Sequence, residues 1–265
     1  MTAQRARPSM GTLVAIEATS DSLRAVASAI DCAFAAIEEV VDRLHPRGAH
    51  SDLCRIHRAA LHTRVEVHAS TAELLLFAQR LHSLTGGRFD PCLPTRPGRL
   101  GDLVIEHADR SGEVAHFVTC RSPLALDLGG FAKGYAVDRA IDVLRENGCS
   151  AGLVNAGGDL RVFGARKEPL LLRRANGHFH NLELVDQAIA VSDADHRGRP
   201  SQHQGYYDPL RSRGAMRSPL VKRYAAIVAE QAVVADALAK CVLLCPQATA
   251  WRALQEFGAA QIGEG

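Results

Sequence analysis

The chain has 265 residues, of which 47% are hydrophobic and 23% are charged, and its formal net charge is +2. This length and composition are typical of a globular protein with one large domain or two closely associated halves. The near-neutral charge gives no reason to expect nucleic acid or a membrane as the main partner. The 7 cysteines form no C-x-x-C pair, which favours a reducing compartment over a disulfide framework.

The N-terminal segment has the features of neither a signal peptide nor a membrane helix. Residues 1–9 contain no apolar run and no cleavage site, so we expect them to be flexible. No later stretch approaches the roughly 18 consecutive apolar residues that suggest a membrane span. We therefore expect a cytoplasmic protein, or an exported one if a leader was omitted from the sequence.

The first predicted elements are a strand and a long amphipathic helix. β-Branched and apolar residues predict the strand over 10–18. The helix is predicted over 23–44, with Ser20 or Asp21 as its cap. Apolar residues at intervals of three and four indicate that one face of this helix packs in the core: Leu23, Val26, Ile30, Phe34, Ile37, Val41 and Leu44.

A second helix and a hairpin are predicted before residue 121. Ser70 and Glu73 are spaced as a capping box for a helix through residue 84, and Gly86-Gly87 ends it. Residues 102–107 and 113–120 alternate as strands do, and a turn containing glycine separates them.

The centre of the chain, 124–164, combines strands, glycine turns and an amphipathic helix. A short strand precedes a turn at Gly129-Gly130, and a second glycine turn at 157–158 lies between two further strands. The helix between them places Val137, Ala140, Ile141 and Leu144 on its apolar face, with Asp138, Arg139, Asp142, Arg145 and Glu146 opposite. Glycine turns let the backbone approach a phosphate-bearing ligand closely. The spacing of the glycines and the lysine within 129–134 matches neither a Rossmann fingerprint nor a P-loop.

The last third begins with three predicted strands and ends with a strand and two helices. Residues 168–174, 178–185 and 188–192 are predicted as an antiparallel run, followed by the strand 221–229 and helices over 232–245 and 249–257. The segment 196–223 has no periodicity and carries 7 lysines or arginines. Such a run is either a solvated loop or a phosphate-recognition segment.

The central stretch carries a resemblance to a known family. D-L-G-G-F-A-K-G-Y-A-V-D at 127–138, followed by N-A-G-G-D at 155–159, resembles the paired signature of the ApbE family, the FAD:protein FMN transferases. Shorter matches occur at 10–12, 51–57, 85–91 and 235–240, whereas 192–214 matches poorly. The resemblance implies an α+β fold over residues 1–265, with mixed or antiparallel sheets and packed helices. The resemblance further implies a T-fold-related single domain of two intimate halves.

The implied activity moves FMN from FAD to a Ser or Thr hydroxyl of an acceptor protein, with release of AMP and assistance from Mg²⁺. Two alternatives stay open: an FAD pyrophosphatase that yields FMN and AMP, and a non-catalytic flavin-binding protein. The resemblance identifies no catalytic base. It implies that the flavin nucleotide contacts Met10, His45, Arg88, Phe89, Asp90, Asp127, Lys133 and Tyr207.

The resemblance also implies a metal site, from which this chain departs. Asp236 corresponds to the carboxylate ligand and Gly130 to a backbone carbonyl ligand, but Lys240 stands where the family has Thr. A protonated lysine cannot coordinate Mg²⁺, so Lys240 either pairs with Asp236 on an exposed helix face or supplies positive charge to the pocket. His57 replaces a family Asn near the pyrophosphate, and is either solvated or functional.

Overall fold

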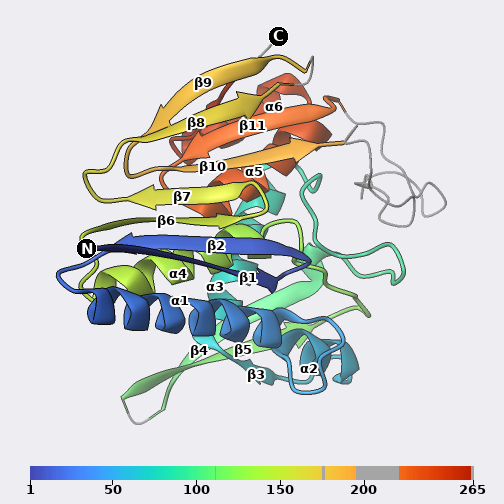
Figure 1. Cartoon of the computed structure of the whole chain (residues 1–265). Helices are drawn as coiled ribbons and strands as arrows, with labels where there is room; N and C mark the ends of the chain where they lie inside the picture. The colour runs from blue at the N-terminus through green and yellow to red at the C-terminus, as the bar shows by residue number, and fades with distance from the viewer. Residues whose placement is uncertain (111, 175–176, 195–220, 264–265) are drawn as a thin grey trace. The chain divides into compact units, whose positions relative to one another are not determined.

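A computed structural model describes residues 1–110, 112–174, 177–194 and 221–263 (Figure 1). The described chain divides into two compact units that are discontinuous in sequence. The first unit contains residues 1–40, 130–194 and 221–263, within those described limits, and the second contains residues 41–129.

The first unit is built on a seven-stranded sheet in which every pairing is antiparallel. Its order is β1-β2-β6-β7-β10-β11-β12. The strands are β1 (Thr2–Ser9), β2 (Thr12–Thr19), β6 (Ala151–Ala156), β7 (Asp159–Phe163), β10 (Ala188–Asp193), β11 (Tyr224–Ala229) and β12 (Ala260–Gln261).

Helices and a small second sheet cover the large sheet. Helix α4 (Ala132–Glu146) packs against β6 and β7, while α5 (Ala232–Leu244) packs against β10, β11 and α4. Helix α6 (Gln247–Glu256) contacts α5. Strands β8 (Glu168–Arg173) and β9 (Phe179–Leu184) pair with each other, and Leu172 and Leu184 join a buried cluster with residues of β6, β7, β10 and β11. Burial of these apolar side chains is the main stabilising contribution.

Helix α1 (Leu23–Leu44) has the predicted apolar stripe, and six of its seven residues are buried or half-buried. Its cap differs from the prediction. The Ser22 hydroxyl accepts a hydrogen bond from the Ala25 amide at 3.1 Å, so Ser22 caps the helix rather than Ser20 or Asp21. The exposed first residue, Leu23, lies beside this cap.

The second unit contains a three-stranded sheet and two helices. The sheet order is β3 (Val65–Val67), β5 (Glu113–Cys120) and β4 (Leu103–Arg110), and β4 and β5 form the predicted hairpin. Helices α2 (Asp52–Arg58) and α3 (Ala69–Leu84) and the 3₁₀ turn η1 (Leu100–Asp102) complete the unit. The capping-box prediction was wrong, because the N-cap of α3 is His68, two residues before Ser70, and the His68 side chain accepts a hydrogen bond from the Ser70 amide.

Four further predictions need correction. Residues 2–9, predicted to be flexible, form the edge strand β1 and pair along their whole length with β2. Met10 and Gly11 form the turn of that hairpin, with φ of 50° and 72°, rather than the start of a strand. Strand β10 pairs with β7 and β11 instead of β9. In place of the short strand predicted before Gly129, the described residues form an isolated bridge between Cys92 and Leu126.

The α+β class with antiparallel sheets is confirmed. All seven cysteines are free thiols. None of the helices in the described ranges combines the length and apolarity needed to cross a bilayer.

Candidate functional site

Two lysines and two aspartates gather where α4 begins, and we call Lys133, Asp159, Asp236 and Lys240 the lysine–aspartate cluster. Lys133 lies in the first turn of α4, Asp159 opens β7, and the other two lie one turn apart on α5. The Lys133 ammonium donates to Asp159 and lies 3.8 Å from Asp236, and the Lys240 ammonium donates to Asp236. All four residues belong to the first unit.

Burial makes these contacts obligatory. The side chain of Asp236 is 0% exposed and that of Asp159 is 2% exposed. A buried carboxylate without a partner is costly. The desolvation of Asp236 is compensated by the two ammonium groups and by the Gly134 amide, which lies 3.1 Å away. Lys133, at 31% exposed, is the most accessible member of the cluster and the one best placed to meet a ligand.

Close contact between α4 and α5 depends on Gly134. A Cβ atom at this position would lie 2.3 Å from the Ala232 carbonyl oxygen, so a larger residue would push the two helices apart. The same close approach lets the Gly134 amide donate to a carboxylate on the neighbouring helix. Glycine at 134 therefore helps to fix the position of Asp236 relative to α4.

Asp138 is a structural residue whose place differs from the prediction. The sequence predicts it on the polar face of α4, but it is buried and pairs with Arg161 at 2.7 Å. Its carboxylate also accepts from the amides of Ala232 and Val233, at 2.9 and 2.8 Å, and so caps the start of α5. Burial raises the pKa of Asp138, an effect that Arg161 and these amides oppose. The sequence does contain a signal for this burial, because Asp138 lies between Val137 and Ile141 of the buried stripe.

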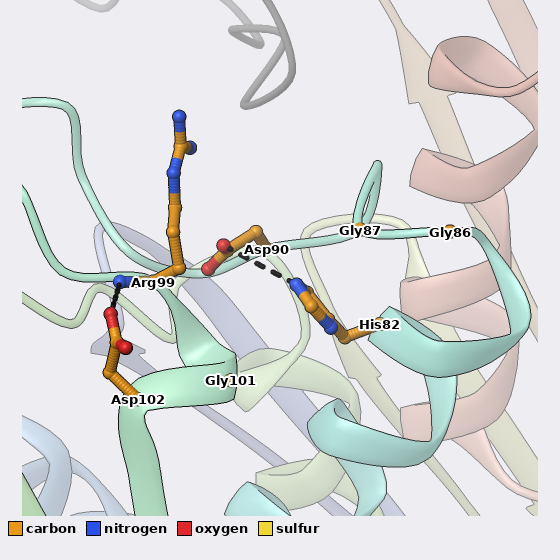
Figure 2. A pocket seen from close by; sticks show the side chains of 7 residues that line it. All are labelled: His82, Gly86, Gly87, Asp90, Arg99, Gly101 and Asp102. Carbon is orange, nitrogen blue, oxygen red and sulfur yellow. Dashed lines mark hydrogen bonds and ion pairs between the residues drawn. The ribbon is translucent and has the colours of Figure 1, made fainter. Parts of the chain in front are cut away.

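The second unit contains a cavity of about 310 Å³ (Figure 2). Asp90 lies at its wall with a side chain that is 0% exposed. The Asp90 carboxylate accepts from the Cys92 amide at 2.8 Å and the Leu100 amide at 3.4 Å, and lies 3.7 Å from His82. Asp90 therefore holds the loop around the cavity in place. The full lining is His82, Gly86, Gly87, Asp90, Arg99, Gly101 and Asp102.

The Asp127 turn lies next to this loop within the second unit. The Asp127 amide donates to the Pro91 carbonyl at 2.9 Å, and the Cys92–Leu126 bridge continues the pairing. Asp127 is exposed, and its carboxylate accepts from the Gly129 amide. Neither glycine of the pair 129–130 has positive φ, whereas Gly157 and Gly158 do. Two segments implicated by the resemblance, around residues 90 and 127, are thus neighbours.

The remaining predicted residues have varied surroundings. Phe89 is buried, and Arg88 beside it is half-buried. His45 is exposed after the end of α1, and its Nδ1 accepts from the Arg47 amide. Met10 is half-buried in its turn. Tyr207 lies outside the described residues.

His57 lies on helix α2. Its Nε2 accepts a hydrogen bond from the Leu126 amide at 2.7 Å, and Arg96 bonds its carbonyl oxygen at 3.0 Å. Burial, followed by the charge of Arg96, lowers the pKa of His57. His57 therefore acts as a neutral acceptor that anchors the segment leading to Asp127.

The residues at the implied metal site do not fit Mg²⁺ in this arrangement. Mg²⁺ requires an octahedron of oxygen ligands, and an ammonium group has no lone pair to offer. The two oxygens of Asp236 already accept from Lys240 and from the Gly134 amide. Within the described ranges, no three His, Cys, Asp or Glu side chains are grouped to hold a metal ion.

The fold and the site therefore define an α+β protein of antiparallel sheets. In its first unit, the lysines of the lysine–aspartate cluster neutralise two buried aspartates. The chain belongs to the ApbE family, whose model matches residues 10–262. A search of curated proteins found no match.

Solved structures with this fold include three described as ApbE proteins. The apo flavinyl transferase ApbE of Pseudomonas stutzeri has a TM-score of 0.79 at 18% identity, covering 100% of this chain and 92% of that one. The flavin transferase ApbE of Vibrio cholerae has a TM-score of 0.75 at 19% identity, with coverages of 100% and 94%. The ApbE protein of Thermotoga maritima has a TM-score of 0.72 at 21% identity, with coverages of 96% and 87%.

Proposed function

We propose that this chain is a flavin transferase that moves FMN from FAD to a Ser or Thr hydroxyl of an acceptor protein and releases AMP. The observation that carries the proposal is membership of the ApbE family over residues 10–262. The solved proteins named flavin or flavinyl transferases share the fold over nearly their whole length, which supports it.

The proposed reaction breaks the phosphoanhydride bond of the FAD pyrophosphate and forms a phosphoester bond to the acceptor. The acceptor oxygen forms a bond to the FMN phosphorus, the bond from that phosphorus to the bridging oxygen breaks, and AMP leaves. The hydroxyl proton passes to a base or to solvent. Reactions of this kind depend mainly on positioning and on neutralisation of phosphate charge.

We propose that the lysine–aspartate cluster supplies this neutralisation. Lys133 is partly accessible and carries a fixed positive charge at the N-terminal end of α4, where helix dipoles favour anions. It would face the pyrophosphate while it keeps its contact with Asp159. The proposal assigns no step to Mg²⁺, because the surroundings of Asp236 do not fit that ion.

For the flavin nucleotide, we propose contacts from Asp127 and from the loop that contains Arg88 and Phe89. Pairing between the segments around residues 91 and 127 supports this assignment, because one ligand could touch both. In this proposal Asp90 shapes the loop, since amide groups already occupy its carboxylate. Met10 and His45 are proposed as outer contacts.

Release of AMP distinguishes the enzyme from a non-catalytic flavin-binding protein. We expect purified protein mixed with FAD and an acceptor to produce AMP, and Asp127→Ala to weaken FAD binding without unfolding the chain, because Asp127 is exposed. AMP that appears equally without acceptor would indicate FAD hydrolysis. FAD binding without any AMP would indicate a flavin-binding protein.

A further inference from the structure

Two histidines face each other across the β4–β5 hairpin of the second unit. His107 and His116 are directly opposite in the antiparallel register. Their Nδ1 atoms are 2.8 Å apart, and the rings meet edge to face with centroids 4.8 Å apart. No residue of this pair belongs to the proposed flavin site.

The contact between the two Nδ1 atoms has a direct chemical consequence. A hydrogen bond between them requires one nitrogen to carry a proton and the other to present its lone pair. In the tautomer that carries this proton on Nε2 instead, both Nδ1 atoms present lone pairs toward the same point. Neutral imidazole nitrogens are among the preferred ligands of divalent transition metals.

The spacing is close to that of a chelating pair. In a tetrahedral zinc site with Zn–N bonds of about 2.0–2.1 Å, the two nitrogens are about 3.3 Å apart. The rings would therefore separate by roughly 0.5 Å to admit the ion, a shift within reach of ordinary side-chain rotation. The backbone pairing of β4 and β5 holds both ligands in place before the ion arrives.

We propose that His107 and His116 form a binding site for a divalent transition metal such as Zn²⁺, with water in the remaining positions. His107 is exposed and His116 is half-buried, so solvent can supply those waters. Mg²⁺ is a poor occupant, because it prefers oxygen ligands.

Among the described residues, no third His, Cys, Asp or Glu is grouped with the pair, so the site has two ligands from this part of the chain. Val67 lies beside His116 on β3, and Asp109, two residues along β4, accepts from the Gly112 amide in the hairpin turn. A bound ion would join β4 to β5 near the end of the hairpin and hold the two strands together. This role is independent of flavin transfer.

Zn²⁺ titration of the complete chain tests the proposal, with the ring nitrogens of each histidine followed by ¹⁵N NMR. We expect one equivalent of Zn²⁺ to shift the nitrogens of His107 and His116 first. His107→Ala and His116→Ala should each weaken this binding at least tenfold. His50→Ala serves as the matched control, because His50 is an exposed histidine of the same unit, and it should leave binding unchanged.

The proposal fails if Zn²⁺ shifts other histidines before this pair, or if either variant binds Zn²⁺ as tightly as the wild type. Thermal unfolding of each variant without metal verifies that it is folded. An excess of Mg²⁺ should not displace the bound Zn²⁺, and displacement would also contradict the assignment.

Discussion

At the scale of single residues, Lys240 is the most informative departure from the family pattern. The sequence left open an exposed pair with Asp236 or a role in the pocket. Asp236 is fully buried and the Lys240 side chain is 12% exposed, so the pair does not lie on an exposed helix face. Its ammonium neutralises a buried carboxylate that would otherwise be available to a metal ion.

Replacement of Lys240 by Thr should therefore increase the dependence on Mg²⁺. The substitution frees one oxygen of Asp236 and adds a neutral hydroxyl, which improves the ligand set for a hard cation. We expect flavin transfer by Lys240→Thr to rise steeply with Mg²⁺, whereas the wild type responds less, and calorimetry should show tighter Mg²⁺ binding by the variant. Superimposable Mg²⁺ profiles for the two proteins would rule out this role of Lys240.

His57 illustrates a second residue-scale effect, a dependence of stability on pH. Its folded pKa is lowered, so the unfolded chain takes up a proton more readily than the folded one. The stability that His57 contributes is present above its unfolded pKa of about 6.5 and is lost as pH falls through the lower folded pKa. Protonation would also remove the lone pair that accepts from the Leu126 amide.

We therefore expect the wild type to lose stability relative to His57→Gln below about pH 6.5, because glutamine retains an acceptor but does not titrate in this range. Urea unfolding at pH 7.5 and pH 5.5 measures the difference. Parallel losses in the two proteins would show that His57 is not the titrating group.

At the scale of elements, Asp138 joins three pieces of secondary structure. It lies on α4, pairs with Arg161 of β7 and caps α5, the helix that carries Asp236 and Lys240. Loss of one partner from a buried ion pair leaves the other charge uncompensated.

Asp138→Ala should lower the free energy of unfolding by about 3 kcal/mol or more. Asp142→Ala, on the same helix, is the control, because its pair with Arg139 has both side chains 40% exposed and should contribute less than about 1 kcal/mol. Equal effects of the two substitutions in urea unfolding would contradict the structural role of Asp138.

Local signals in the sequence predicted many of these elements, whereas contacts between distant segments could not be predicted from the sequence. The apolar stripe of α1 and the β4–β5 hairpin both follow from residues a few positions apart. Strand β1 was missed because most of its side chains are exposed, so its order comes from pairing with β2.

The site shows the same limit. The motif residues Lys133 and Asp236 could be named from the sequence, because both lie in recognisable segments. The ion pairs to Asp159 and Lys240, and the cap that Asp138 provides across 94 residues of sequence to Ala232, required the fold. Single-sequence patterns carry little information about such long-range partners.

At the scale of the whole molecule, family membership and fold extend over nearly all of the chain. The acceptor protein would be a separate chain with an accessible Ser or Thr.

The central claim is that this chain transfers FMN covalently to another protein. Co-expression with a candidate acceptor, followed by intact-mass and peptide mass spectrometry, tests it most directly. We predict that the acceptor gains the mass of one FMN, less water, on a single Ser or Thr, and that the gain disappears when that residue is replaced by Ala. An acceptor that stays unmodified while the same chain converts FAD to FMN and AMP would contradict the claim and identify a hydrolase instead.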